Sequence, residues 1–269
     1  MEIVDRGTGV PVVLIPGIQG RWEWMRPAVE AMAARVRVIT FSFADEPSAR
    51  AAFDEADGFG SYVRQVTAAL DQAGVSQAVL CGVSYGGLIA AAAAARYPDR
   101  VPALVLVSPI PLSWAPNERV RFYLRAPRLL APLFCVASVR LYREIAAAVP
   151  GFAAGIRQAL RLAWLALTHL FSPVRMARRT GLLPGADLRA AVRALRVPTL
   201  LVTGEESLDR VVPVRESREY LRLWPHARHV TLPSTGHLGS VTKAAEFADL
   251  VAAFAARAVP SPSERHTRV

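Results

Sequence analysis

The sequence predicts an α/β protein built on a mostly parallel sheet of about six to eight strands, with helices on both faces. Short, continuous apolar runs alternate with longer amphipathic runs along most of the 269 residues, which is typical of parallel strands joined by crossover helices. The composition is 52% hydrophobic and can supply a large core. One internal stretch, residues 111–190, breaks the alternation and predicts a helical insertion.

The elements follow one another in a simple order. The runs predicted to be strands are 10–15, 35–41, 77–83, 103–107, 198–203 and 227–232. The runs predicted to be helices are 22–34, 59–73, 85–97, 214–223 and 242–256. Residues 1–5 also have a strand-like composition. Right-handed crossovers are expected between the parallel strands.

These elements predict one discontinuous core domain, a lid and a tail. The core comprises residues 1–110 and 191–258, and residues 259–269 form a flexible tail rich in proline and serine. Residues 111–190 contain several short amphipathic helices separated by prolines, and 156–171 is the clearest of them. This insertion leaves the sheet at the carboxyl edge of the strands, where ligands bind, so we expect it to act as a lid.

Charge is concentrated in the predicted lid. The chain has a formal net charge of +10, and residues 111–185 contain eleven arginines but only two acids, Glu118 and Glu144. Such a surface fits an anionic or lipophilic substrate, or peripheral contact with an anionic membrane. The alternative is a solvated outer face on ordinary helices. No motif that reads nucleic acid is recognisable, so no nucleic-acid partner is expected.

Location is predicted from what the sequence lacks. The first residues do not resemble a secretory leader, and no uncharged apolar run is long enough to span a bilayer. Two cysteines, Cys81 and Cys135, do not make a disulfide framework. These features favour a cytoplasmic protein.

The stretch from Gly82 to Gly87 carries the clearest chemical signal. Its sequence is Gly-Val-Ser-Tyr-Gly-Gly, and it lies between a predicted strand and a predicted helix. This order is the context of a nucleophile elbow. Glycine at positions 82 and 86 removes Cβ atoms that would collide across so sharp a turn. Ser84 is therefore the predicted nucleophile, and the alternative is an ordinary serine in a glycine-rich turn.

A serine hydroxyl needs a base and a group that orients the base. His237 follows the last predicted strand and should open on the sheet edge that carries the elbow, so it is the predicted general base. The other histidines have poorer positions: His169 in the lid, His226 and His229 beside the last strand, and His266 in the tail.

The orienting acid is expected in the loop 204–213, which follows the strand 198–203. This loop contains Glu205, Glu206 and Asp209. Asp209 is the predicted acid because it falls late in the loop and can reach inward. Glu205 and Glu206 lie close to the strand end, where they could cap it or face solvent, and they remain alternatives.

A developing oxyanion needs two N–H donors. The backbone of Tyr85, directly after the nucleophile, is predicted to supply one, and Ile18 in the loop Pro16–Gly20 the other. Gln19 and Trp22 are predicted to bind substrate. For Trp22 and for Trp24, the alternative is packing against the first helix.

The order Ser84, Asp209, His237, together with Pro16-Gly17 and the elbow, resembles the α/β-hydrolase superfamily. Tyr97-Pro98-Asp99-Arg100-Val101 and Asp209-Arg210-Val211-Val212-Pro213 also resemble it. The likeness covers roughly residues 3–257. Two departures stand out: Pro16-Gly17 replaces the His-Gly of many members, and the first strands of the family are almost absent.

The resemblance implies a serine hydrolase that cleaves a carboxylic ester through an acyl-enzyme, without a metal or a cofactor. The same three residues also serve thioesterases, acyltransferases and hydrolases of carbon–carbon bonds. Two further alternatives are a binding protein that has lost the reaction and an accessory subunit whose lid is an interface. Serine at position 84 disfavours the members that use an aspartate nucleophile.

Overall fold

The structure is a computed structural model that describes residues 1–133, 141–149, 151, 155–158, 160, 164, 168–169 and 172–259. Its centre is a seven-stranded sheet in the order β1-β3-β2-β4-β5-β6-β7. Six strands are parallel, and β1 alone pairs antiparallel, with β3. The strands are β1 (Val4–Arg6), β2 (Pro11–Ile15), β3 (Arg37–Thr40), β4 (Val79–Val83), β5 (Leu104–Val107), β6 (Thr199–Thr203) and β7 (Arg228–Thr231).

The strand count lies within the predicted range, and each of the six predicted apolar runs contains a strand. The seventh strand comes from the N-terminal residues, where Val4, Asp5 and Arg6 pair with Thr40, Ile39 and Val38. The sheet is therefore parallel except at one edge, as the alternation of elements predicts.

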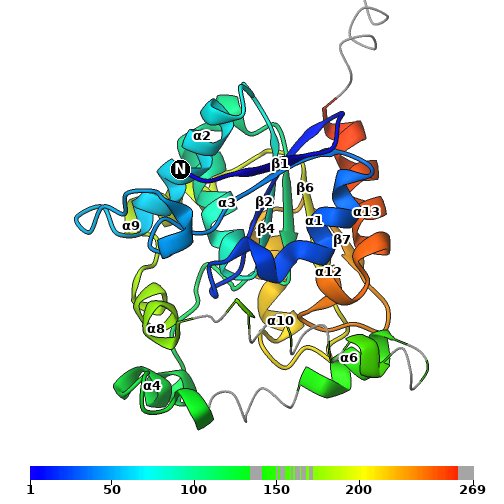
Figure 1. Ribbon diagram of the computed structural model, residues 1–269. Helices are drawn as coiled ribbons and strands as arrows, with labels where there is room; N and C mark the ends of the chain where they lie inside the picture. The colour runs from blue at the N-terminus through cyan, green and yellow to red at the C-terminus, as the bar shows by residue number, and fades with distance from the viewer. Residues whose placement is uncertain are drawn as a thin grey trace, which may run out of the picture.

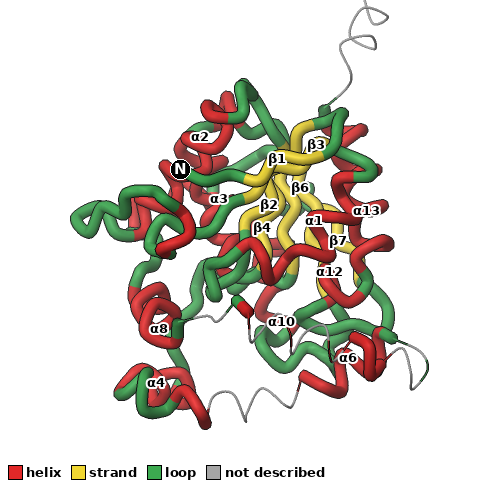
Figure 2. Tube along the Cα trace, viewed as in Figure 1, coloured by secondary structure: helices red, strands yellow, loops and turns green. Residues whose placement is uncertain are grey.

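Helices cover both faces of the sheet (Figures 1 and 2). One face is covered by α1 (Arg26–Ala33) and α13 (Ala244–Ala258), and the other by α2 (Phe59–Gln72), α3 (Tyr85–Arg96) and α9 (Ala186–Arg193). Shorter helices are α10 (Val214–Ser217), α11 (Glu219–Leu223), α12 (Gly239–Thr242), and the 3₁₀ turns η1 (Trp22–Met25), η2 (Pro47–Ala49) and η3 (Pro98–Arg100). The predicted helix 22–34 thus begins as the 3₁₀ turn η1, and the predicted helices 214–223 and 242–256 are interrupted at Arg218 and Lys243.

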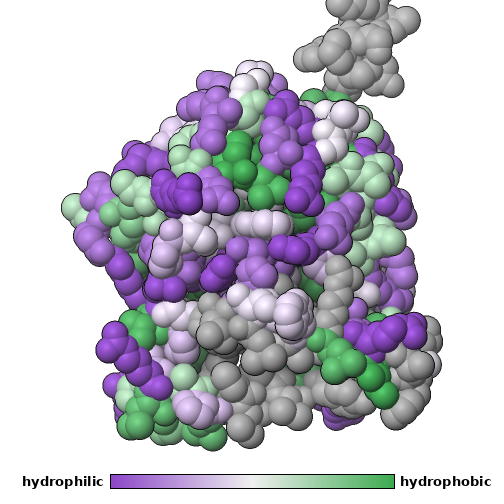
Figure 3. All heavy atoms as spheres, in the orientation of Figure 1, coloured by the Kyte–Doolittle hydropathy of each residue, from purple (hydrophilic) through white to green (hydrophobic). Residues whose placement is uncertain are grey.

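The segment between β5 and β6 contains α4 (Glu118–Arg125), α6 (Tyr142–Ala148), α8 (Pro173–Gly181) and α9. Figure 1 places α4, α6 and α8 beyond the carboxyl ends of the parallel strands. The predicted helix 156–171 lies largely outside the described residues, as do Cys135 and residues 260–269 of the predicted tail. On the face shown in Figure 3, apolar side chains lie near α4 and α6 among hydrophilic ones.

Helix α9 packs with the core. Val192 is fully buried, and its carbonyl accepts a hydrogen bond from the indole of the fully buried Trp224 (3.0 Å). The lid boundary predicted at residue 190 therefore runs through a helix that packs on α3.

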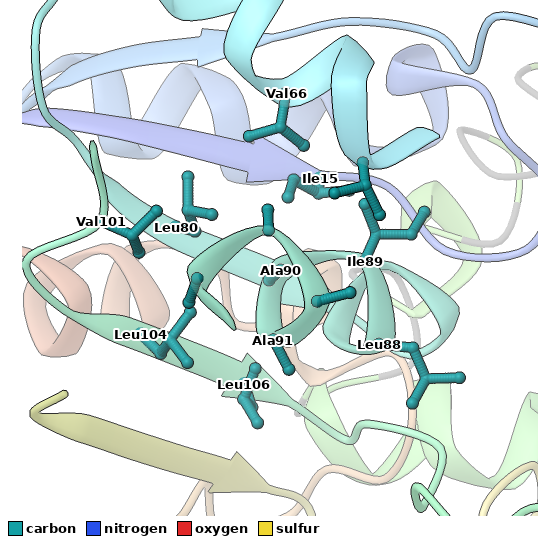
Figure 4. Packing of buried hydrophobic residues seen from close by; sticks show 14 of the residues in the cluster. Ile15, Val66, Leu80, Leu88, Ile89, Ala90, Ala91, Val101, Leu104 and Leu106 are labelled. Carbon is teal, nitrogen blue, oxygen red and sulfur yellow. The ribbon is translucent and has the colours of Figure 1, made fainter. Parts of the chain in front are cut away.

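Helix α3 is almost entirely buried because its residues are small. Alanines 90–94 are inaccessible to solvent, and this lets the helix lie close to β4 and β5, with Leu80, Leu104 and Leu106 against it (Figure 4). Such close packing holds the first turn of α3, which carries the elbow, firmly on the sheet.

Candidate active site

Ser84 lies at the turn between β4 and α3 in a strained backbone conformation, with φ 54° and ψ −115°. A non-glycine residue in such a region costs on the order of 1–3 kcal/mol. Its amide extends the sheet by donating to the Val107 carbonyl (2.8 Å). The turn is therefore held by the sheet on one side and by α3 on the other.

The two elbow glycines are required by space. A Cβ on Gly82 would lie 2.2 Å from the Gly86 carbonyl oxygen, and a Cβ on Gly86 would lie 2.4 Å from the Pro16 carbonyl oxygen. Both distances are shorter than any real contact, so a side chain at either position would force the turn apart.

The loop that follows β2 lies directly beside Ser84. A Cβ on Gly17 would be 3.6 Å from the Ser84 Cβ. The Gly17 carbonyl accepts a hydrogen bond from the Gly20 amide (2.9 Å), which orients the peptide that joins Gly17 to Ile18. Because the C=O and N–H of a trans peptide point in opposite directions, the Ile18 N–H is turned away from this bond. Neither the Ile18 nor the Tyr85 amide donates to another described residue.

Asp209 and His237 are joined by a hydrogen bond between the Asp209 Oδ2 and the His237 Nδ1, at 3.2 Å. The other carboxylate oxygen of Asp209 accepts from the amides of Val211 (2.9 Å) and Val212 (3.0 Å). With both oxygens bound, the carboxylate is locked in one orientation. Among the described residues, no hydrogen bond joins Ser84 to His237, and catalytic hydrogen bonds are often long in the absence of substrate.

The loops that carry Asp209 and His237 pack backbone against backbone. A Cβ on Gly204 would lie 2.5 Å from the Gly236 Cα, and a Cβ on Gly236 would lie 2.8 Å from the Asp209 nitrogen. Glu205 joins the same loops, since its amide donates to the Thr235 carbonyl (2.7 Å) and its carboxylate accepts from the Ser234 amide (2.6 Å). Of the three candidate acids, Asp209 contacts the imidazole, Glu205 holds the loop, and Glu206 is exposed.

A family model described as alpha/beta hydrolase fold matches residues 10–244. The chain belongs to the α/β-hydrolase fold family. It is 30% identical to a 2-hydroxymuconate semialdehyde hydrolase of Pseudomonas putida, over 94% of this chain and 90% of that protein. It is also 30% identical to a pimeloyl-[acyl-carrier protein] methyl ester esterase of Yersinia enterocolitica, over 66% of this chain and 69% of that protein.

Solved structures agree on the fold. An esterase from Exiguobacterium antarcticum superimposes with a TM-score of 0.76 at 16% identity, and 94% of each chain is covered. The family membership identifies this α/β hydrolase as an enzyme.

Electrostatics couple the two partners of the Asp209–His237 pair. Burial acts to lower the pKa of His237, but the charge and hydrogen bond of Asp209, together with Glu144, outweigh it, and the pKa is raised above 6.5. Burial acts to raise the pKa of Asp209, but His237 and the amides of Val211 and Val212 bring it below 3.8. The two shifts agree that the pair favours an ionised Asp209 beside a protonated His237.

Two residues that the sequence analysis left unassigned also reach this region of the α/β hydrolase. The Arg179 guanidinium, on α8, donates to the Ile18 carbonyl (2.8 Å) and pairs with Asp45 (2.7 Å) and Glu46 (2.6 Å). Glu144, on α6, binds backbone amides beside His237. Glu144 could have been noticed as one of two acids in an arginine-rich segment, but nothing in the sequence separates Arg179 from its neighbours.

The predicted substrate-binding residues have different surroundings. The Gln19 side chain folds back, so that its Oε1 lies 2.7 Å from where a Gly17 Cβ would be. Trp22 packs against the core cluster of α1 and α13, with the Arg26 guanidinium 5.4 Å from its ring. The Trp24 indole donates to the His169 carbonyl (3.0 Å). Substrate contact by Gln19 and Trp22 remains a prediction.

The rings of the other described histidines have hydrogen-bond partners outside the Asp209–His237 pair: Thr168 for His169, Thr203 for His229 and the Val197 carbonyl for His226. His226 is exposed, and His229 is half-buried with its ring bonded to the Thr203 hydroxyl (2.9 Å); His266 lies outside the described residues. In the part of the chain that the structure describes, no group of three or more His, Cys, Asp or Glu side chains could hold a metal ion. No helix among these residues is long and apolar enough to cross a bilayer.

Proposed function

We propose that the α/β hydrolase cleaves carboxylic esters, with Ser84 as nucleophile, His237 as general base and Asp209 as the acid that orients it. The observation that carries this proposal is the strained Ser84 elbow on the same sheet edge as the Asp209–His237 pair. The methyl ester esterase among the relatives gives independent support for ester chemistry.

In the proposed reaction, the Ser84 Oγ attacks the ester carbonyl carbon while His237 accepts the hydroxyl proton. The amides of Ile18 and Tyr85 stabilise the oxyanion, and Asp209 stabilises the imidazolium. His237 then returns the proton to the departing alcohol, which leaves an acyl group on Ser84. Water, activated by His237, hydrolyses this acyl-enzyme and releases the carboxylic acid.

A fluorophosphonate probe tests the proposal, because it labels an activated serine. The wild-type enzyme should be labelled, whereas Ser84→Ala and His237→Ala should not. A screen of p-nitrophenyl esters of increasing chain length then defines the acyl group. Labelling of Ser84→Ala would place the nucleophile elsewhere, and the absence of labelling in all three proteins would favour a binding protein.

Hydrolysis of a carbon–carbon bond is the second candidate. The relative at 30% identity over 94% of this chain is named a 2-hydroxymuconate semialdehyde hydrolase, and this name favours a small unsaturated carboxylate as substrate. A comparison of kcat/KM for that semialdehyde and for p-nitrophenyl esters separates the two. A higher value for the semialdehyde would make carbon–carbon hydrolysis the main activity.

The segment between β5 and β6 is proposed to be a lid that admits lipophilic or anionic substrates and contacts anionic membranes. Ile156, Leu160 and Trp164 are exposed apolar side chains in this segment, and the exposed Arg157 directly follows Ile156 in the sequence. Binding to anionic vesicles at low salt, lost at high salt and absent with zwitterionic vesicles, is the expected result. No binding at low salt would remove the membrane contact.

A further inference from the structure

Glu144 is a fully buried acid outside the predicted triad. It lies on α6, in the segment between β5 and β6, and its side chain has no solvent exposure. An ionised carboxylate in such a place costs free energy unless other groups compensate it. Its surroundings therefore need a specific explanation.

The contacts of Glu144 are with the backbone on both sides of His237. Its Oε1 accepts hydrogen bonds from the amide of Gly236 (2.9 Å) and from the amide of Leu238. The second oxygen, Oε2, is buried without a hydrogen-bond partner among the described residues. One oxygen thus ties together the two peptide groups that determine where the imidazole lies.

The charge of Glu144 also acts on the imidazole. Among the residues that the structure describes, the ionisable groups that shift the pKa of His237 are Asp209, from the loop after β6, and Glu144, from α6. Burial acts to lower the pKa of His237, and both carboxylates act to raise it. Burial raises the pKa of Glu144 itself to about 6, against the opposite effects of the Leu238 amide and the charge of His237. Above this pH the ionised carboxylate favours the protonated imidazole, the form that exists after His237 has taken the serine proton.

We propose that Glu144 is a positioning residue: from α6 it holds the backbone that carries His237 and adds negative charge beside the imidazole. The proposal rests on the proposed function, because His237 must be the base for this placement to affect turnover. It also links catalysis to the docking of α6, since His237 loses two backbone anchors if that helix moves away.

Two substitutions separate the charge from the anchor. Glu144→Gln keeps a carbonyl oxygen for the two amides and nearly the same volume, but removes the charge. Glu144→Ala removes both. Glu118→Gln is the matched control, because it removes an acidic charge from an exposed position on α4.

The pKa of His237 is measured first, by NMR of ¹⁵N-labelled imidazole in a Ser84→Ala background, which does not depend on activity. Glu144→Gln should lower this pKa by about one unit, because one nearby negative charge is lost, and the acid limb of kcat/KM should move to lower pH with it. Glu144→Ala should lower kcat about tenfold or more with little change in KM. Glu118→Gln should change none of these values.

An unchanged His237 pKa in Glu144→Gln, or wild-type kcat in Glu144→Ala, would overturn the proposal. If Ser84→Ala itself keeps the wild-type rate, the proposed function fails. The NMR measurement still reports whether Glu144 acts on His237, so the two failures are distinguishable. A merely structural role predicts a larger loss of stability in Glu144→Ala than in Glu144→Gln and no change in the pKa of His237 in Glu144→Gln.

Discussion

Replacing Arg179 with methionine should destabilise the protein and disturb the loop beside Ser84. The Arg179 guanidinium is fully buried and pairs with two carboxylates whose side chains are 2% (Asp45) and 0% (Glu46) exposed. Arg175 also binds Glu46 (3.0 Å), so Glu46 keeps one partner in the variant. Asp45 does not share that contact, and its charge would lose its main compensation.

Removal of one partner from a buried ion pair costs about 3–5 kcal/mol, because the other charge stays desolvated. We expect Arg179→Met to lose about this much free energy of unfolding. Asp45→Asn added to Arg179→Met should recover part of the loss, since it removes the uncompensated charge. The neighbouring Arg178 is the control: it pairs with Glu55, 75% exposed at its side chain, and such surface pairs contribute about 0–1 kcal/mol.

Urea unfolding at neutral pH measures the free energy of unfolding of four proteins: the wild type, Arg179→Met, Arg179→Met with Asp45→Asn, and Arg178→Met. Hydrolysis of p-nitrophenyl esters measures their kcat. Because Arg179 also donates to the Ile18 carbonyl, kcat should fall about 10- to 100-fold, which is less than the roughly 10²- to 10³-fold loss caused by removing an oxyanion donor outright. A loss below about 1 kcal/mol in Arg179→Met, equal to that of Arg178→Met, would refute the reasoning. Wild-type kcat would separately refute the link to the Ile18 loop.

Two further predictions concern the Asp209–His237 pair. The pKa of Asp209 is lowered below 3.8, so its ionised form stabilises the folded protein above pH 3.8, and this stabilisation is lost as the pH falls through the lowered pKa. The pKa of His237 is raised above 6.5, so its protonated form stabilises the folded protein below pH 6.5, and this stabilisation is lost as the pH rises through the raised pKa. The difference in unfolding free energy between the wild type and Asp209→Asn should therefore be largest between these pH values, and a pH-independent difference would contradict this. Gly236→Ala would place a Cβ 2.7 Å from the Leu208 carbonyl group; we expect a loss of about 1–3 kcal/mol, measured by urea unfolding, and reduced turnover. Wild-type stability would show that the two loops can separate without cost.

The sheet and the elbow were predictable because their signals are local. A strand buried on both faces reads as an apolar run, and a turn that tolerates no Cβ must have glycine at Gly82 and Gly86. The closeness of His237 to Asp209 was predictable by a similar argument, because parallel strands bring the loops at their carboxyl ends to one edge.

The contacts of Glu144 and Arg179 were not predictable in this way. Glu144 meets amides 92 and 94 residues further along the chain, and Arg179 meets Asp45 across 134 residues. The amphipathic pattern of residues 111–190 indicates helices, but it does not say where they dock. The predicted end of the lid at residue 190 falls inside α9 for the same reason. A helix that packs on the core and a helix that covers a site have similar amphipathic sequence patterns.

The anchoring of the inserted segment limits how this enzyme can be re-engineered. Grafting another family member's insertion between β5 and β6 is an obvious route to a new substrate range. Such a graft would leave Asp45 and Glu46 buried without Arg179, and the amides of Gly236 and Leu238 without Glu144. Transplants that keep positions 144 and 179, or that change their partners together with them, therefore have the better prospect of yielding folded and active chimeras.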